Sequence, residues 1–142
     1  MEKPENVDLV ENPFKIESDI GLKGLRVRQQ WNDKIDMYIE QEKILALYLY
    51  TDWKGSDYSF LRNLTGIIKL HILSGRESLN INAIEAMTSL ETLNLKCITK
   101  EKIDFTKLTN LKECVISWWP GAISIFQVKT LESLYLDEFK SD

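Results

Sequence analysis

A short pattern, apolar-x-x-apolar-x-apolar, recurs six times along this chain. Ile44-x-x-Leu47-x-Leu49 is one clear copy, and the copies start near residues 22, 44, 67, 90, 111 and 131. Their spacing of 20 to 23 residues is nearly constant. Such a period is typical of repeat architectures, in which each unit buries its apolar face only against its neighbours. The repeat therefore limits the fold to a stack of similar units.

Each copy ends in an alternation of apolar and other residues, which predicts a strand with its two faces in different surroundings. About 15 residues then lead to the next copy, enough to return the chain for a parallel strand but too few for a long helix. We expect an α/β solenoid with about six short parallel strands and with return segments that are irregular, extended or 3-10 helical. Residues 1–21 are expected to cap it, and residues 22–142 to form it. Corners with positive φ are expected at Gly55, Gly66, Gly75 and Gly121.

Residues 31–43 follow a different period. Their apolar side chains fall at i, i+4, i+7 and i+8, namely Trp31, Ile35, Tyr38 and Ile39. This spacing predicts an amphipathic helix in the first repeat, with Asn32 or Asp33 as its N-cap and with Trp31 in the core. In the N-terminal segment, Phe14-Lys15-Ile16 is compatible with a short edge strand.

The composition excludes several classes of protein. Lysine plus arginine number 18 against 22 acidic residues, so the net charge is −4, which argues against nucleic-acid binding. No apolar stretch approaches the ~20 residues of a membrane span, and the N-terminus lacks the order of a secretory signal. Only two cysteines are present, without a CxxC spacing. We therefore expect a cytoplasmic protein that binds neither nucleic acid nor membrane.

Few residues in the sequence suggest catalysis. His71 is the only histidine, and no phosphate-binding, zinc-protease or nucleophile-elbow motif occurs. Cys114 falls in an apolar column and is expected to be an inert core thiol, whereas Cys97 follows a strand and is expected to be partly exposed. We therefore predict a protein that is not an enzyme and has no cofactor, metal or catalytic residue.

Over residues 22–136 the chain resembles leucine-rich-repeat proteins. The usual consensus places an asparagine or cysteine three residues after the last strand leucine, where a ladder of hydrogen bonds forms. That column here reads Asp52, Gly75, Ile98, Trp119 and Phe139, so the ladder is absent and a regular, tightly curved horseshoe is not expected. Segments such as Trp53-Lys54-Gly55 and Ile103-Asp104-Phe105 look similar to a largely uncharacterised group of small bacterial leucine-rich-repeat proteins. The resemblance implies a protein-interaction role, in its sharper form that of an immunity protein or antitoxin.

The repeat register predicts which side chains share the outward face of the sheet. The middle column reads Arg26, Tyr48, His71, Asn94, Val115 and Tyr135. The following column reads Arg28, Tyr50, Leu73, Lys96, Ser117 and Asp137. Tyrosine and arginine are enriched at the energetic centres of protein interfaces. We therefore predict protein binding by Arg26, Arg28, Tyr48, Tyr50, Trp53, His71, Asn94, Lys96, Trp118 and Tyr135.

Three tryptophans leave the ends of two strands, and each has two interpretations. Trp53, Trp118 and Trp119 are expected to rim the outward face. Alternatively, Trp119 packs inward at the vacant ladder position. Tyrosine is also common in strands for reasons of packing alone.

The leading hypothesis is a non-enzymatic module that binds a protein on the outward face, with a toxin as a candidate partner. The chain's acidity suits a basic partner. One alternative is a structural solenoid fragment of a longer leucine-rich-repeat protein, which would self-associate through its bare C-terminal edge. A less favoured alternative is a small-molecule binder with a pocket between Trp118-Trp119-Pro120-Gly121 and the sheet. The oligomeric state is not predicted.

Overall fold

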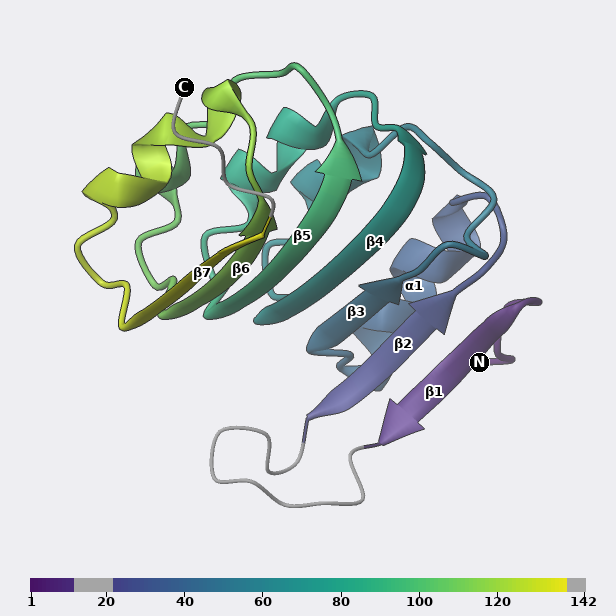
Figure 1. Ribbon diagram of the computed structural model, residues 1–142. Coiled ribbons are helices and arrows are strands. Elements are labelled where there is room, and N and C mark those ends of the chain that lie inside the picture. The colour runs from purple at the N-terminus through teal and green to yellow at the C-terminus, as the bar shows by residue number, and fades with distance from the viewer. Residues whose placement is uncertain (12–21, 138–142) are drawn as a thin grey trace.

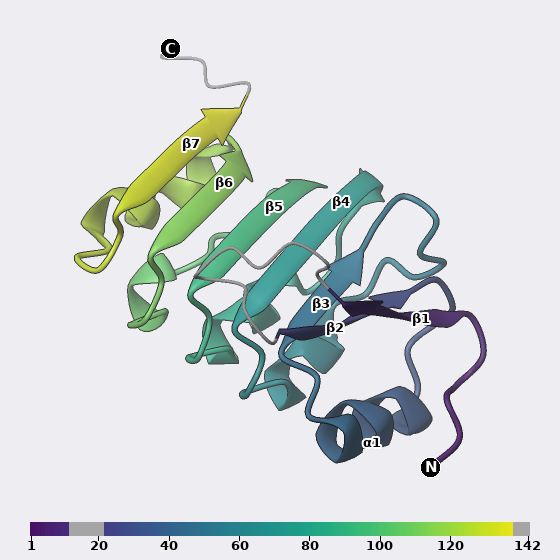
Figure 2. The ribbon, with the colours of Figure 1, turned by 90° about the horizontal axis from the view of Figure 1, so that it is seen from below.

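The computed structural model describes residues 1–11 and 22–137, which form a single seven-stranded sheet in the order β1 to β7 (Figure 1). The strands are β1 Val7–Glu11, β2 Lys23–Val27, β3 Ala46–Leu49, β4 Lys69–Glu77, β5 Thr92–Ile98, β6 Glu113–Ser117 and β7 Ser133–Asp137. The segments between them contain α1 Asp33–Glu42 and the 3-10 helices η2 Ser59–Asn63, η3 Ile81–Ala86, η4 Phe105–Lys107 and η5 Pro120–Gln127. These helical segments lie together on one side of the sheet (Figure 2). The prediction of short 3-10 return segments is confirmed.

Strands β2 to β7 are the six predicted strands, and each pairs in parallel with the next along the chain. The predicted middle column is in register, because Arg26 pairs with Tyr48, Tyr48 with His71, and so on through Asn94 and Val115 to Tyr135. A one-residue slip would turn every apolar side chain to the other face. The alternation in each copy is therefore sufficient to specify the register.

The edge strand β1 was not anticipated at its observed place. It pairs antiparallel with β2, with Val7 opposite Val27 and Leu9 opposite Leu25. The sequence suggested an edge strand at residues 14–16, which lie outside the described residues. Val7 is buried against the core and carries the apolar column one strand further than the repeat does.

The helix α1 matches its prediction closely. Asn32 is the N-cap, and its side-chain oxygen accepts a hydrogen bond from the Ile35 amide at 3.2 Å. Ile35, Tyr38 and Ile39 are buried on one face. Trp31 is only half-buried, so its placement in the core was too strong an expectation. Its ring packs against the edge of the core instead.

The core lies between the sheet and the return segments. The inward columns of β2 to β6 are almost fully buried and consist of Leu25, Leu47, Leu70, Leu93 and Cys114, and of Val27, Leu49, Ile72, Leu95 and Ile116. Their counterparts in β7, Leu134 and Leu136, are only half-buried. Burial in each unit thus depends on both neighbours, as stacking requires.

The expectation of positive φ at the glycine corners was wrong. Among the described residues, positive φ occurs at Asn6, Lys43 and Asn80, and none of the glycines has it. Gly121 serves a close approach instead. A Cβ there would collide with the Glu101 carbonyl and with the indole nitrogen of Trp119.

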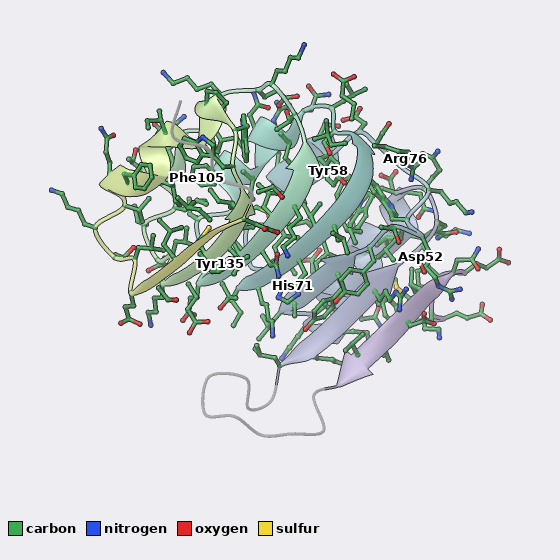
Figure 3. All side chains as sticks on the ribbon, in the orientation of Figure 1. Asp52, Tyr58, His71, Arg76, Phe105 and Tyr135 are labelled. Atoms are coloured by element: carbon green, nitrogen blue, oxygen red, sulfur yellow. The ribbon has the colours of Figure 1, made fainter. Side chains whose placement is uncertain are left out.

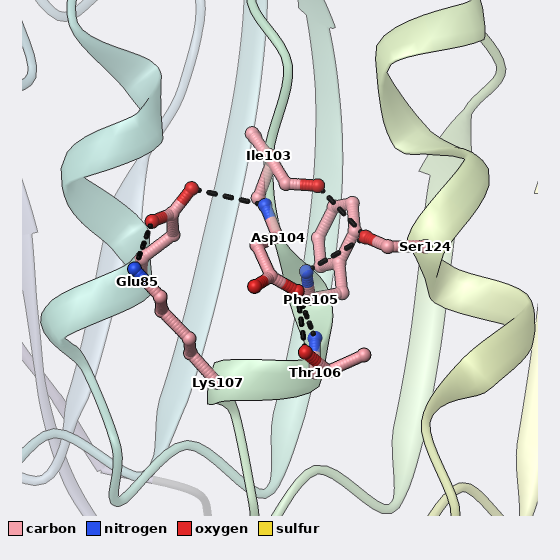
Figure 4. A network of polar contacts seen from close by, with 7 residues as sticks. All are labelled: Glu85, Ile103, Asp104, Phe105, Thr106, Lys107 and Ser124. Carbon is pink, nitrogen blue, oxygen red and sulfur yellow. Dashed lines mark hydrogen bonds and ion pairs between the residues drawn. The ribbon is translucent and has the colours of Figure 1, made fainter.

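Side-chain hydrogen bonds connect neighbouring repeats on the return side (Figure 4). Ser124 on η5 accepts from the Phe105 amide and donates to the Ile103 carbonyl, both at 2.8 Å. Glu85 on η3 accepts from the Asp104 amide at 2.9 Å and from Lys107 Nζ at 3.1 Å. Short helical turns leave backbone groups without partners, and these side chains satisfy them.

Candidate protein-binding face

The outward face of the sheet is the face opposite the return segments. Its N-terminal half carries a cluster of four predicted residues, which we call the aromatic cluster: Arg26, Tyr48, Tyr50 and His71. The Tyr48 ring lies 5.2 Å from His71 in an edge-on arrangement and 6.0 Å from Tyr50, measured between ring centroids. The Arg26 guanidinium lies 5.0 Å from the Tyr50 ring centroid. Parallel pairing creates this cluster, because it aligns one residue from each of three consecutive strands.

Burial and charge act in opposite directions on Tyr50. Partial burial raises the pKa of its phenol above the ordinary value, and the neighbouring Tyr48 adds to that rise. The positive charges of Arg26 and Lys69 lower the pKa and offset part of it. The phenol is therefore neutral near pH 7 and can both donate and accept a hydrogen bond from a partner.

Ion pairs hold three of the predicted basic residues on this face. Arg26 binds Asp52 at 2.6 Å, Arg28 binds Asp8 at 3.2 Å and Lys96 binds Asp137 at 3.3 Å. All six side chains are partly exposed, so each pair contributes little to stability. The pairs do restrict the rotamers of long side chains, which lowers the entropy that a partner must remove.

The carboxylates of these pairs were missed as site residues. Asp137 stood in a predicted column, and Asp52 stood in the vacant ladder column, but neither was assigned a role. The sequence did contain a signal for Asp52. This residue stands where the leucine-rich-repeat consensus has an asparagine, close to the outward columns that begin with Arg26 and Arg28. Figure 3 labels Asp52 together with His71 and Tyr135.

Asn94 borders the aromatic cluster as the register partner of His71, whereas Trp118 and Tyr135 lie apart from it. Asn94 continues the middle column on β5, and Tyr135 ends it on β7 with 62% of its surface exposed. Trp118 follows β6, and its ring lies 5.7 Å from that of Phe126 on η5. The face therefore has an aromatic cluster at β2–β4 and a single exposed tyrosine at its other end.

Trp53 and Trp119 do not rim the face, contrary to expectation. Trp53 is 2% exposed, and its ring packs 4.9 Å from Tyr58 and 5.7 Å from Phe60. Trp119 is 9% exposed, and its indole N–H donates to the Glu101 carbonyl at 2.7 Å. Trp119 thus occupies the ladder column and makes one ladder-like bond, as the alternative interpretation predicted.

The net negative charge of the chain does not lie on this face. A third outward column, two residues before the middle one, contains Lys69 and Glu113. Together the three columns carry Arg26, Arg28, Lys69 and Lys96, but only two carboxylates, Glu113 and Asp137. With Asp8 and Asp52 included, the charges nearly balance. A partner for this face is therefore selected by shape and aromatic contact more than by net charge.

The cysteines are buried and protonated. Cys97 is buried, which corrects the expectation of partial exposure, and desolvation raises the pKa of its thiol to about 11. Desolvation likewise raises the pKa of Cys114 to about 12. Thiols are weak nucleophiles compared with thiolates. Neither cysteine has the environment of a reactive residue.

Two further searches of the described residues, 1–11 and 22–137, gave negative results. No group of three or more histidine, cysteine, aspartate or glutamate side chains is placed to hold a metal ion. None of the helices in this part of the chain is both long and apolar enough to cross a bilayer.

Comparison with known proteins returned no match: no protein-family model, no curated protein and no solved structure resembles the chain significantly. The resemblance to leucine-rich-repeat proteins stays a prediction from the repeat pattern. The function has to be argued from the chain's own geometry.

Proposed function

We propose that this protein is a non-enzymatic recognition module of the leucine-rich-repeat type, a short solenoid that binds a partner protein on its outward sheet face. The observation that carries the proposal is the aromatic cluster of Arg26, Tyr48, Tyr50 and His71. The register of three strands assembles it from residues more than 40 positions apart. In its sharper form, the partner is a toxin and the module blocks it by covering its surface.

The cluster has the physical properties of an interface centre. Tyrosine buries much surface for little loss of side-chain entropy, and tyrosine and arginine dominate the binding energy at many interfaces. Ring contacts and the Arg26–Asp52 pair hold the side chains in place before a partner arrives. Such preorganisation lowers the entropy cost of association.

The size of the face suits one partner domain. Six parallel strands at ~4.8 Å spacing span about 24 Å. Typical interfaces bury roughly 800 Å² on each partner, so the outward face supplies a large share of one. The return side is covered by helical segments and presents no comparable row of tyrosines.

The repeat assignment rests on two observations. Each of six parallel strands pairs with its sequence neighbour, and a return segment with its own apolar side chains follows all but the last. Hydrogen bonds between adjacent copies on the return side, such as those of Ser124 and Glu85, support a stacked arrangement.

Affinity capture from a lysate of the source organism tests the function. The wild type is compared with a Tyr48→Ala, Tyr135→Ala variant and with a matched control, Met37→Ala, Ile123→Ala, whose side chains are exposed on the return side. A hot-spot tyrosine contributes about 2 kcal/mol, which is about 30-fold in affinity. We expect the partner to bind the wild type and the control, but to be lost or strongly weakened with the tyrosine variant.

Two controls complete this experiment. Thermal unfolding verifies that both variants fold. Expression of the captured protein alone, and then together with the module, tests the immunity form, which requires toxicity that the module suppresses. Retention of the same partner by the folded tyrosine variant would contradict binding on the outward face.

A further inference from the structure

A groove runs along α1 on the return side of the sheet, away from the aromatic cluster. Two adjoining hollows make it up, one of about 370 Å³ and one of about 760 Å³. Asp36 and Asn63 line both, so the hollows are continuous between α1 and η2. We call this feature the α1–η2 groove.

One wall of the groove is an acidic stripe of α1. Asp33, Asp36 and Glu40 fall at i, i+3 and i+7, which places them on one face of the helix. Asp57 adds a fourth carboxylate near the smaller hollow. Among the described residues that line the two hollows, Lys43 is the one basic side chain.

These carboxylates have no ion-pair partner within the described part of the chain, in contrast to several others. Glu42 on the same helix binds Lys23 at 3.3 Å, and Glu85 binds Lys107. No corresponding pair forms at Asp33, Asp36 or Glu40. The lining of the groove is therefore net negative, with four carboxylates against one lysine.

Glu40 is also unfavourable for its own helix. Acidic side chains stabilise the first turn of a helix, as Asp33 and Asp36 do, but they are disfavoured in the last turn, where the helix dipole is negative. The last turn of α1 contains no basic residue to compensate. Local helix stability explains the two aspartates but not Glu40.

The floor of the groove is apolar and aromatic. Trp31 stacks on Phe60 with ring centroids 3.9 Å apart and an angle of 7° between the planes. Both rings are half-buried, and Trp31 Nε1 donates to Asp36 at 3.0 Å. Ile39 and Leu64 line the larger hollow. Aromatic faces beside carboxylates are typical of sites for organic cations.

A buried polar group also borders the smaller hollow. Trp53 lines it, and the indole nitrogen of Trp53 is buried without a hydrogen-bond partner in the described structure. Buried donors of this kind are normally satisfied. A bound molecule reaches this donor only when the Trp53 ring turns toward the hollow, because the nitrogen has no solvent-exposed surface.

We infer that the α1–η2 groove binds a short basic peptide segment of a partner protein. Its lysine or arginine side chains pair with Asp33, Asp36 and Glu40, and an apolar side chain enters the larger hollow beside Ile39 and Leu64. Ten helical residues extend about 15 Å, the length of about five residues of extended peptide. Charge complementarity selects this ligand, because the walls are acidic and the floor is apolar. The inference does not depend on the function proposed for the outward face.

Fluorescence anisotropy with defined peptides tests the inference. The probe is fluorescein-labelled Lys-Leu-Lys-Lys-Leu-Lys, and its counterpart carries glutamate in place of lysine. The test variant is Asp36→Asn, Glu40→Gln, and the matched control is Glu113→Gln, Glu132→Gln, which removes the same charge from exposed carboxylates elsewhere. Loss of two charge-assisted contacts is expected to weaken lysine-peptide binding about ten-fold. The control is expected to stay within about two-fold of the wild type.

Amide chemical-shift mapping locates the peptide independently. Shifts confined to α1 and η2 support the inference, and shifts on the outward strands overturn it. Three anisotropy results also overturn it: equal binding of the glutamate peptide, an unchanged affinity in the test variant, or equal weakening in the control. Thermal unfolding shows whether the test variant folds, and because Glu40→Gln removes an unfavourable charge from the last turn, that substitution is not expected to destabilise α1.

Discussion

Ser124→Ala provides a direct test of how neighbouring repeats are held together. The Ser124 hydroxyl makes two hydrogen bonds of 2.8 Å, one from the Phe105 amide and one to the Ile103 carbonyl. Each intramolecular bond of this kind contributes about 1 kcal/mol net, and a backbone group that loses its partner costs somewhat more. Because Ser124 is half-buried, water replaces the lost partners only in part. We expect the free energy of unfolding to fall by about 2 kcal/mol.

Urea unfolding followed by circular dichroism measures this loss, and thermal unfolding should show a decrease in Tm of about 6 °C. Ser133→Ala is the matched control, since Ser133 is exposed on the last strand. The Phe105 amide should also exchange faster with deuterium in the Ser124 variant, because its acceptor is gone. A loss below about 0.5 kcal/mol, together with unchanged exchange at Phe105, would refute the idea that these bonds hold neighbouring repeats together.

Three further predictions concern other parts of the molecule. Asn32→Ala should lower the free energy of unfolding by about 1 kcal/mol through loss of the α1 N-cap, as measured by urea unfolding. Cys97 and Cys114 should resist alkylation by iodoacetamide at pH 7 in the folded protein and react once it is unfolded, as followed by mass spectrometry, because burial raises both thiol pKa values, to about 11 and about 12. A hydrogen bond from the Asn80 side chain is the main cause that lowers the pKa of Asp57 in the folded protein. The stabilisation that this carboxylate gives to the fold should therefore be complete above its ordinary pKa near 4, and it should be lost as the pH falls through the lower pKa of the folded state. Asp57→Asn should therefore reduce the dependence of Tm on pH at acid pH, as measured by thermal unfolding. An unchanged dependence would contradict this role of Asp57.

The strands and their register were predictable because the signal is local and repeated. Alternation within each copy places Leu93 and Leu95 inward and Asn94 outward, and the near-constant period aligns each copy with the next. The α1 helix was predictable for a similar reason, since its apolar period and its Asn32 cap both lie within about ten residues. The edge strand β1 belongs to no repeat, and so the repeat did not reveal it.

The aromatic cluster was predicted as a set of residues, but its internal contacts were not. Register alone aligns Arg26, Tyr48 and His71, whereas the pairing of Arg26 with Asp52 depends on how the chain leaves β3. Trp53 was misplaced for the same reason. The chain turns toward the return side just after β3, and burial of its ring against Tyr58 outweighs any position at the rim.

The α1–η2 groove had no signature in the sequence. Asp33, Asp36 and Glu40 are spaced as an ordinary solvated helix face would be, and Phe60 and Leu64 read as core positions of the next repeat. Whether these side chains line one groove depends on the distance between α1, a full α-helix, and η2, a thinner 3-10 helix, which follow neighbouring strands. Only the tertiary structure sets that distance.

The sequence by itself determined the number, direction and register of the parallel strands, because periodic burial acts through residues that are close along the chain. The tertiary structure alone decided which tryptophans are buried, which carboxylates hold the basic residues of the outward face, and where a groove remains between return segments. These features depend on packing between different segments of the chain, where the outcome reflects side-chain size and competing contacts and not any local pattern.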